Sequence, residues 1–385
     1  MTRPGGEGAG EPRAETVGSL LRDAAVLRAA RRGSLADQAV LNDAALDAIK
    51  LQEDIGLDVI TDGEVRRTGW VQTPRWLDAF TVTEGRGMLN WRQGGGPASA
   101  ANPGATSQPG IGQSSGKGGY PAVTRRVETA RRTAEMTAEY AFLAKHSRSR
   151  TKFTMPSPSY HRRFWSEQHS RAVYDSAEEY LGEIRDFLRE AVDAVLALGC
   201  DYIQLDAPNY GSYCDPGTRA RMGAEGRDPD ADLAFDAELD NSLFDDIPGD
   251  VTRALHICRG NGPAGMWHSA GGYGAISAAL FPKLAFGRLL LEYDSDRAGG
   301  FEPLAEVRAG TIVVLGLLTT KSDTLDDEAA VEARIGEAAR YKPLAELALS
   351  TQCGFASAPG DNPVTPAGQR AKLEMVARVA RRTWR

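Results

Sequence analysis

Short apolar runs alternate with longer amphipathic stretches along the whole chain. The runs are rich in branched residues and cover residues 14–20, 57–63, 151–157, 201–207, 252–258, 288–294, 311–317 and 347–353. Between them, apolar residues recur at three- and four-residue steps, which predicts helices at about 37–55, 124–147, 177–198, 271–285, 326–343 and 366–384. Eight strand–helix repeats in 385 residues predict an α/β fold, a (β/α)8 TIM barrel with its site in the loops after the strands.

One segment departs from this alternation. Residues 85–119 contain 11 glycines in 35 positions, mixed with Ser, Ala, Pro and Gln. Such a composition cannot bury enough apolar surface to order itself, so it predicts a flexible insertion after the second strand. The insertion would emerge at the catalytic face and could close over a substrate; a mobile segment without that role is the alternative. We expect residues 1–13 to form a disordered tail and 14–385 a single barrel domain.

Composition narrows the classes of function. The net charge is −7 with acids and bases interspersed, so there is no basic stripe for nucleic acid and no polybasic membrane patch. The N-terminus lacks the apolar core of a signal peptide, and no apolar run approaches the length that spans a bilayer, so we expect a cytoplasmic protein. Four cysteines, at 200, 214, 258 and 353, favour metal, catalytic or buried roles over a disulfide framework.

Soft metal ligands stand at the ends of three predicted strands. His256 and Cys258 end the fifth strand, Glu292 ends the sixth and Cys353 ends the eighth. Strand side chains alternate between faces, so His256 and Cys258 would point the same way. In a barrel these strand ends share one rim, so the four side chains can converge on zinc in a tetrahedral array. The alternative is that Glu292 pairs with Arg297 and both cysteines are simply buried.

Polar side chains end other strands as well. Ser19 follows the first strand, Glu64 the second, and Asp206 ends the fourth. Carboxylates suit a substrate ammonium group, and a hydroxyl beside backbone N–H groups can hold a carboxylate, so the pattern predicts an amino-acid substrate. Asp206 could instead cap the loop that follows it. Glu64 could form a surface ion pair with Arg66 or Arg67.

The predicted donor set suits a thiol substrate. Two thiolates donate charge to zinc and reduce its Lewis acidity, which disfavours water activation. A free thiol has a pKa of about 8.5, and coordination to a metal removes its proton. The predicted site would therefore generate and orient a sulfur nucleophile.

Seven stretches resemble a known family. They are VGSLLR (17–22), DVITDGEVRR (58–67), YIQLDAP (202–208), HICRGN (256–261), LLLEYDSDRAGGFEPL (289–304), VVLGLLTTKS (313–322) and STQCGFAS (350–357). Together they resemble the catalytic barrel of cobalamin-independent methionine synthase, and more closely its short single-barrel relatives. The resemblance implies zinc, homocysteine as the methyl acceptor, 5-methyltetrahydrofolate as the donor, and no cobalamin. It implies zinc ligation by His256, Cys258, Glu292 and Cys353. It implies that the amino-acid part of the substrate is held by Ser19, Glu64 and Asp206.

The sequence departs from that family at three points. It has no counterpart of the second, N-terminal barrel of full-length methionine synthases. The family motif Asp-Glu-Pro is Asp206-Ala207-Pro208 here, so one carboxylate is missing. Where the family places a His after the seventh strand, this chain has Lys321, which could donate a proton or bind an anionic substrate tail. We therefore group Lys321 with Asp206 as candidate catalytic residues.

An aromatic segment after the third strand is a candidate donor-binding surface. Tyr160, His161 and Trp165 could stack on the folate, although aromatic packing beneath the insertion is the alternative.

The resulting hypothesis is a zinc-dependent S-methyltransferase that acts on homocysteine or a similar small thiol. Its partners would be a thiol substrate and a methyl donor, with no nucleic acid or membrane; the sequence does not determine the oligomeric state. One alternative is a zinc-dependent alkyltransferase that joins another thiol to another electrophile, like the epoxide-opening coenzyme M transferases. Such a thiol carries a sulfonate, for which carboxylates are unsuitable. The other is a non-catalytic zinc- or thiol-binding barrel, for which a polar rim would be unnecessary.

Overall fold

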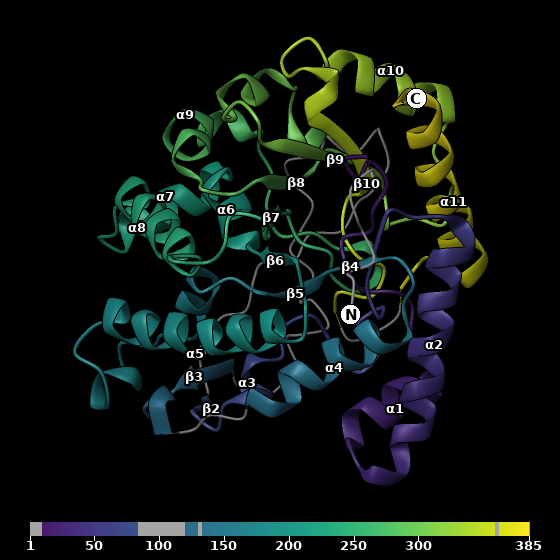
Figure 1. Ribbon diagram of the computed structural model, residues 1–385. Coiled ribbons are helices and arrows are strands. Elements are labelled where there is room, and N and C mark those ends of the chain that lie inside the picture. Colours follow the sequence, from purple (N-terminus) through teal and green to yellow (C-terminus); the bar gives the residue numbers. More distant parts are fainter. Residues whose placement is uncertain (1–9, 84–119, 130–132, 359–361, 385) are drawn as a thin grey trace.

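A parallel sheet forms the centre of the molecule (Figure 1). The computed structural model describes residues 10–83, 120–129, 133–358 and 362–384. Six strands lie in the order β10-β9-β8-β7-β6-β5, and every adjacent pair is parallel. Their bounds are β5 Phe153–Pro156, β6 Tyr202–Asp206, β7 Thr252–Ile257, β8 Arg288–Glu292, β9 Ile312–Leu318 and β10 Leu347–Thr351. The α/β fold with a parallel sheet is therefore confirmed, and the glycine-rich segment predicted at 85–119 lies outside the described residues.

The first two predicted strands are shorter than expected but are paired in order. β1 (Val59–Ile60) pairs in parallel with β4 (Arg150–Thr151), which leads directly into β5. Ala14 forms a parallel bridge with Leu349 of β10, and Glu15 forms one with Val59 of β1. The N-terminal segment thus contacts both β10 and β1.

Residues 11 and 13, which belong to the expected tail, contact the rest of the chain. The Arg13 guanidinium donates to the carbonyls of Ala345 and Leu347, and the Arg13 backbone N–H donates to Asp58. Glu11 pairs with the buried Arg288. Backbone and side-chain contacts therefore hold residues 11 and 13, and residues 1–9 of the expected tail lie outside the described residues.

Most predicted helices occur near their expected positions. They are α2 Gln38–Ile55, α4 Thr133–His146, α5 Ala177–Ala197, α10 Glu328–Ala338 and α11 Pro366–Thr383. Side-chain caps begin two of them: Ser176 accepts from the Glu179 N–H and Thr365 accepts from the Gly368 N–H. The helix predicted over 271–285 is wrong, since only α9 (Ser277–Leu280) and flanking 3-10 turns form there. Three glycines at the start of this segment and a proline within it oppose a continuous helix.

Several short elements were not predicted. α1 (Ala24–Arg32) precedes α2, and α3 (Thr73–Trp76) precedes an antiparallel hairpin of β2 (Phe80–Thr83) and β3 (Tyr120–Val123). The loop after β6 holds α6 (Pro208–Tyr213), α7 (Pro216–Ala224) and α8 (Pro229–Ser242). Each helix in that loop has a proline in its first turn, which ends the previous helix and favours the start of the next.

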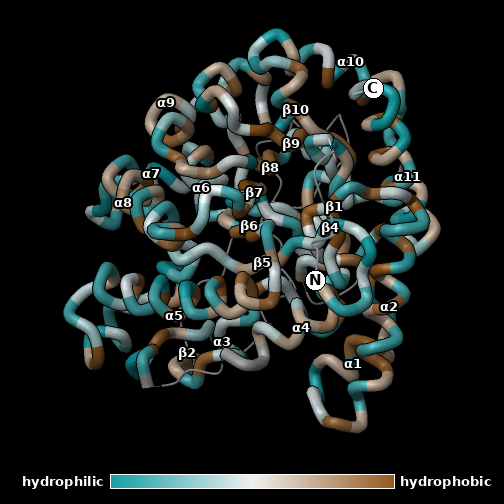
Figure 2. The backbone as a smooth tube through the Cα atoms, in the orientation of Figure 1, coloured by the Kyte–Doolittle hydropathy of each residue, from teal (hydrophilic) through white to brown (hydrophobic). Residues whose placement is uncertain are grey.

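Two separate apolar clusters lie on the two opposite faces of the strands. The larger lies between strands and helices, and hydrophobic residues are accordingly concentrated along β8, β9 and β10 in Figure 2. The smaller comes from the opposite strand face and consists of Val17, Val59, Tyr202, Ala254, Leu290, Ile312, Val314 and Ala348. Strand side chains alternate between faces, so residues two positions apart lie on the same face. The face that carries the smaller cluster therefore also carries Gln204, Asp206, His256 and Glu292. Within the described residues, no helix has the length and apolarity required to cross a membrane.

Candidate metal and substrate site

Three of the four predicted metal ligands lie together. The ligand atoms of His256, Cys258 and Cys353 are all within 4.8 Å of one another, and all three residues are buried. His256 Nδ1 lies 3.1 Å from the Leu290 carbonyl, so the ring donates there and its lone pair is on Nε2. His256 Nε2 is buried with no hydrogen-bond partner among the described residues. An imidazole whose second nitrogen is free beside two sulfurs fits a soft metal ion such as zinc.

The two sulfurs interact directly. Their hydrogen bond holds the pKa of the Cys353 thiol well below its usual range and raises that of Cys258 well above. Burial lowers the pKa of His256, but the nearby Cys353 sulfur raises it overall. Without a cation the pair therefore carries one negative charge, and a second thiolate requires a cation between them.

Glu292 is near this group but is bound elsewhere. Its carboxylate accepts from the Arg259 backbone N–H at 2.7 Å, and pairs with Arg297 at 3.2 Å and Lys321 at 3.3 Å. Burial raises the pKa of Glu292, but Lys321 and the two arginines lower it to about 2. The Arg297 pairing expected as the alternative to metal ligation is present, although the charge of Glu292 also acts on Cys258.

Lys321 is an ion-pair partner in this structure. Its ammonium lies 3.3 Å from Glu292 Oε1 and 3.5 Å from Asp294 Oδ2, and its side chain is 3% exposed. These contacts place Lys321 at the end of β8, next to the predicted ligand set.

The predicted substrate carboxylates lie on either side of the β4–β5 segment, since Glu64 follows β1 and Asp206 ends β6. Glu64 accepts from the Thr154 hydroxyl at 2.7 Å and is 3.6 Å from Arg67. Both ends of the Glu64–Arg67 pair are buried, so it is not the surface ion pair considered above. Asp206 accepts from the Gln204 amide at 2.8 Å, and α6 begins without a side-chain cap from Asp206. Burial raises the pKa of Asp206 to about 7.

Ser19 lies where the loops after the first and eighth predicted strands meet. Its hydroxyl accepts from the Ala356 N–H, and its carbonyl accepts from the Phe355 N–H. A Cβ on Gly354 would lie 2.1 Å from Ser19 Oγ, so only glycine permits this approach. The guanidinium of Arg22 ties the same loops together by donating to three backbone carbonyls, those of Glu64, Arg67 and Ala356.

Two of the three predicted donor-binding aromatics line a large cavity. Tyr160 and Trp165 face a cavity of about 990 Å³ whose wall also includes Asn209, Asp236 and His268. Burial raises the pKa of Tyr160. His268 of the cavity wall donates its backbone N–H to the Arg259 carbonyl at 2.9 Å, so the wall reaches the loop that follows Cys258.

His161 has a different role from the other two aromatics. Its Nε2 is 2.7 Å from the Thr73 hydroxyl and its Nδ1 is 2.8 Å from the Ser157 carbonyl. Burial lowers its pKa to about 4, so the ring is neutral near pH 7. His161 fixes the loop after β5 and is not among the described residues that line the cavity.

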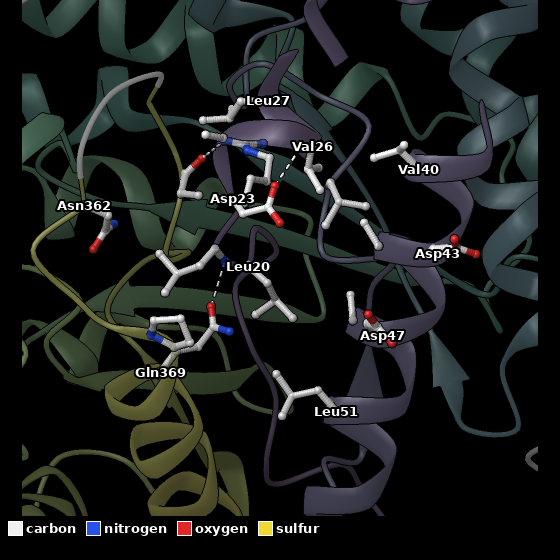
Figure 3. Close-up of a pocket in the computed structure, with 18 of the residues that line it drawn as sticks. Leu20, Asp23, Val26, Leu27, Val40, Asp43, Asp47, Leu51, Asn362 and Gln369 are labelled. Carbon is white, nitrogen blue, oxygen red and sulfur yellow. Dashed lines mark hydrogen bonds between the residues drawn. The ribbon is translucent and has the colours of Figure 1, made fainter. Parts of the chain in front are cut away.

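A second cavity lies behind the loop that carries Ser19. It measures about 690 Å³ and lies between the starts of α1 and α11 and one face of α2. Figure 3 shows Asp43 and Asp47 of α2 on one side of it and Gln369 of α11 on the other. The candidate metal ligands do not line it, so it is distinct from the site described above.

Sequence reasoning missed two residues of the substrate site, Thr154 and Gln204. They are direct cross-strand partners, and they contact Glu64 and Asp206 respectively. The signal for Gln204 was available, because it lies two positions before Asp206 and so shares its face of the strand.

Comparisons with known proteins agree with this fold. No family model matches the chain. Two uncharacterized proteins of Bacillus subtilis strain 168 are similar over nearly their whole length. YxjH is 33% identical and YxjG 32% identical, each over 386 residues that cover 97% of this chain and 95% of the relative.

Solved structures give the class. A Listeria monocytogenes protein provisionally named a vitamin-B12-independent methionine synthase is 26% identical, with a TM-score of 0.65 over 98% of this chain and 100% of its own. A B12-independent methionine synthase from Shewanella sp. W3-18-1, solved with selenomethionine, shares the fold at 19% identity, with a TM-score of 0.64 over 96% of each chain. The chain belongs to the same family as YxjH and YxjG, and its structural neighbours show that it is similar to cobalamin-independent methionine synthases. It is an enzyme of the methyltransferase type.

Proposed function

We propose that the enzyme is a zinc-dependent S-methyltransferase that moves a methyl group from 5-methyltetrahydrofolate to the thiol of homocysteine. The observation that carries the proposal is the buried, unpartnered Nε2 of His256 beside the sulfurs of Cys258 and Cys353. When bound, zinc would lower the pKa of a coordinated substrate thiol, so that its sulfur is a nucleophile near pH 7. This donor set leaves a fourth position, for which we propose Glu292.

The neighbouring residues support an amino-acid substrate. Glu64 and Asp206 would hold the ammonium group, and Ser19 with the backbone N–H groups of its loop would hold the carboxylate. Held at both ends, the substrate would place its thiol toward His256, which is paired in register with Asp206. Orientation of this kind lowers the barrier to methyl transfer without any change in the chemistry.

The cavity beside Tyr160 and Trp165 would hold the methyl donor. Its volume of about 990 Å³ suits a ligand the size of a folate, and aromatic walls favour a flat ring system. We propose that Lys321 keeps Glu292 charged and in place, and that it supplies a proton to the donor nitrogen as the methyl group leaves.

We also propose that the eight parallel segments close into a (β/α)8 barrel. The bridges from Ala14 to Leu349 and from Glu15 to Val59 support closure through the N-terminal segment. A closed ring would place all strand ends on one rim, which is the arrangement that the metal and substrate residues require.

The test is zinc content followed by zinc-edge absorption spectroscopy with and without homocysteine. We expect bound zinc, two sulfur ligands in the free enzyme and a third after homocysteine is added. Zinc with an unchanged sulfur count would contradict homocysteine as the acceptor and direct the search to other thiols. Absence of zinc from protein purified without chelators would remove the metal from the proposal.

A further inference from the structure

Gln204 is buried in the candidate substrate site, and the oxygen of its side-chain amide has no hydrogen-bond partner among the described residues. Its side chain is fully buried, and its Nε2 donates to the Val17 carbonyl and to Asp206 Oδ1, each at 2.8 Å. Both partners are acceptors, so the nitrogen must face them and the orientation of the amide is determined. Gln204 Oε1 is left with no hydrogen-bond partner within the described parts of the chain.

The strand paired with that of Gln204 holds another buried acceptor. Gln204 and Thr154 are direct neighbours in the β5–β6 register, and the Thr154 hydroxyl donates to Glu64 Oε1. The second oxygen of that carboxylate, Glu64 Oε2, is also buried without a partner among the residues described. Gln204 therefore bonds Asp206 directly and is the register neighbour of Thr154, which bonds Glu64, so it is linked to both proposed ammonium-binding carboxylates.

Such a group of acceptors is costly without a donor. A buried polar atom without a hydrogen bond costs free energy, and clustered acceptors repel one another. A primary ammonium group offers three N–H donors at tetrahedral angles, which matches one oxygen from each of the three side chains.

We propose that Gln204 is the third ligand of the substrate ammonium group and makes the enzyme specific for α-amino thiols over thiols without an amine. Its Nε2 at the same time positions the Asp206 carboxylate. This assignment rests on the proposed function for the identity of the substrate, but it concerns recognition of the amine and requires neither the metal nor the methyl donor.

The experiment compares two thioethers by isothermal titration calorimetry. L-methionine and 4-(methylthio)butyrate share the thioether and the carboxylate, and only methionine carries the amine. We expect the wild-type protein to bind methionine more tightly. Gln204→Met, which has similar volume and no amide, should weaken methionine binding about tenfold and leave 4-(methylthio)butyrate binding within about twofold.

A further variant separates recognition from structure. Gln52→Met is the matched control, because Gln52 is also fully buried but both of its amide atoms are bonded within the protein, to Ala48 and Thr61. It should leave the preference unchanged even if it lowers the melting temperature.

The outcomes are distinct. Equal weakening of both ligands in Gln204→Met would overturn the role of the Oε1 acceptor. A wild-type protein that does not discriminate between the ligands would overturn amine recognition as a whole. Failure of the proposed methyl transfer would appear instead as missing zinc or missing product, with the methionine preference intact.

Discussion

At the scale of single residues, the informative feature is which polar atoms have no partner. His256, Glu64 and Gln204 each keep one buried atom without a hydrogen bond within the described residues, although each is otherwise well bonded. Native proteins rarely leave such atoms unsatisfied without a functional reason. These three atoms therefore mark the surfaces toward which a metal ion and a substrate amine would bind.

The first prediction concerns Cys353. Cys353→Ser should lose most bound metal while the protein stays folded, because serine is a far weaker ligand for a soft ion than a thiolate. Metal analysis together with circular dichroism measures both properties. Cys200→Ser is the control, since Cys200 is buried but lies outside the three-residue cluster. Stoichiometric zinc in Cys353→Ser would refute the assignment of this ligand.

The second prediction concerns Glu64. Glu64→Gln should weaken methionine binding roughly tenfold, because a charged acceptor of the ammonium group becomes a neutral amide. Zinc content should not change, since Glu64 is outside the metal cluster. Calorimetry and metal analysis on one preparation decide the point, and an unchanged methionine affinity would remove Glu64 from the substrate site.

At the scale of elements, the loops after the strands control the position of these side chains. A Cβ on Gly18 would lie 2.3 Å from Glu64 Oε1. The absence of a side chain at Gly18 therefore leaves the space that the Glu64 carboxylate occupies. The contact is with the far end of a flexible side chain, and the backbone of Gly18 is not in the left-handed region. The carboxylate can therefore move away at little cost to the fold.

This contact gives the third prediction. Gly18→Ala should displace the Glu64 carboxylate and weaken methionine binding about tenfold, while the free energy of unfolding changes by less than about 1 kcal/mol. Urea denaturation and calorimetry measure the two effects. Gly182→Ala, where a Cβ on helix α5 would meet nothing within 4 Å, is the control for stability. A large loss of stability with normal binding would contradict this account.

The same scale shows where sequence reasoning succeeded and where it failed. The helices α2, α5 and α11 were predicted nearly to the residue, because each has a continuous amphipathic pattern, and Ser176 and Thr365 cap the last two. The segment 271–285 has the same spacing of apolar residues but breaks into short turns. Periodicity records which side chains are buried and does not show whether the backbone between them is continuous.

At the scale of the whole molecule, one buried ion network joins distant strands. Glu15 accepts from Lys152 and Tyr202 and pairs with Arg288, and the side chains of Glu15 and Lys152 are fully buried. These residues lie at the starts of different strands, at the opposite end from the metal cluster. Burial raises the pKa of Glu15, but Lys152 and Arg288 lower it to about 2.

The network leads to the fourth prediction, which concerns acid stability. Because the folded-state pKa of Glu15 lies below the usual 4.5, its contribution is complete above about pH 4.5 and is lost as pH falls toward 2. The shift corresponds to about 3 kcal/mol. Glu15→Gln should destabilise the protein by about that amount near pH 7, with the difference from wild type shrinking below pH 4.5.

Urea denaturation across this pH range measures the effect. Glu178→Gln is the matched control, since Glu178 pairs with Arg162 but is half exposed. It should cost less than about 1 kcal/mol near pH 7. A difference between Glu15→Gln and wild type that does not change with pH would show that packing, and not the charge of Glu15, explains the loss.

The sequence alone was sufficient to identify an α/β fold, the strands of its parallel sheet and the residues that end them. Alternation along a strand and apolar spacing along a helix are local properties, so they are readable without knowledge of the neighbours. The convergence of His256, Cys258 and Cys353 followed from the assumption that parallel strand ends share one edge. Only the tertiary structure decided how each side chain is used. Lys321 binds Glu292 and Thr73 binds His161, and in each case the two partners come from segments far apart in the chain.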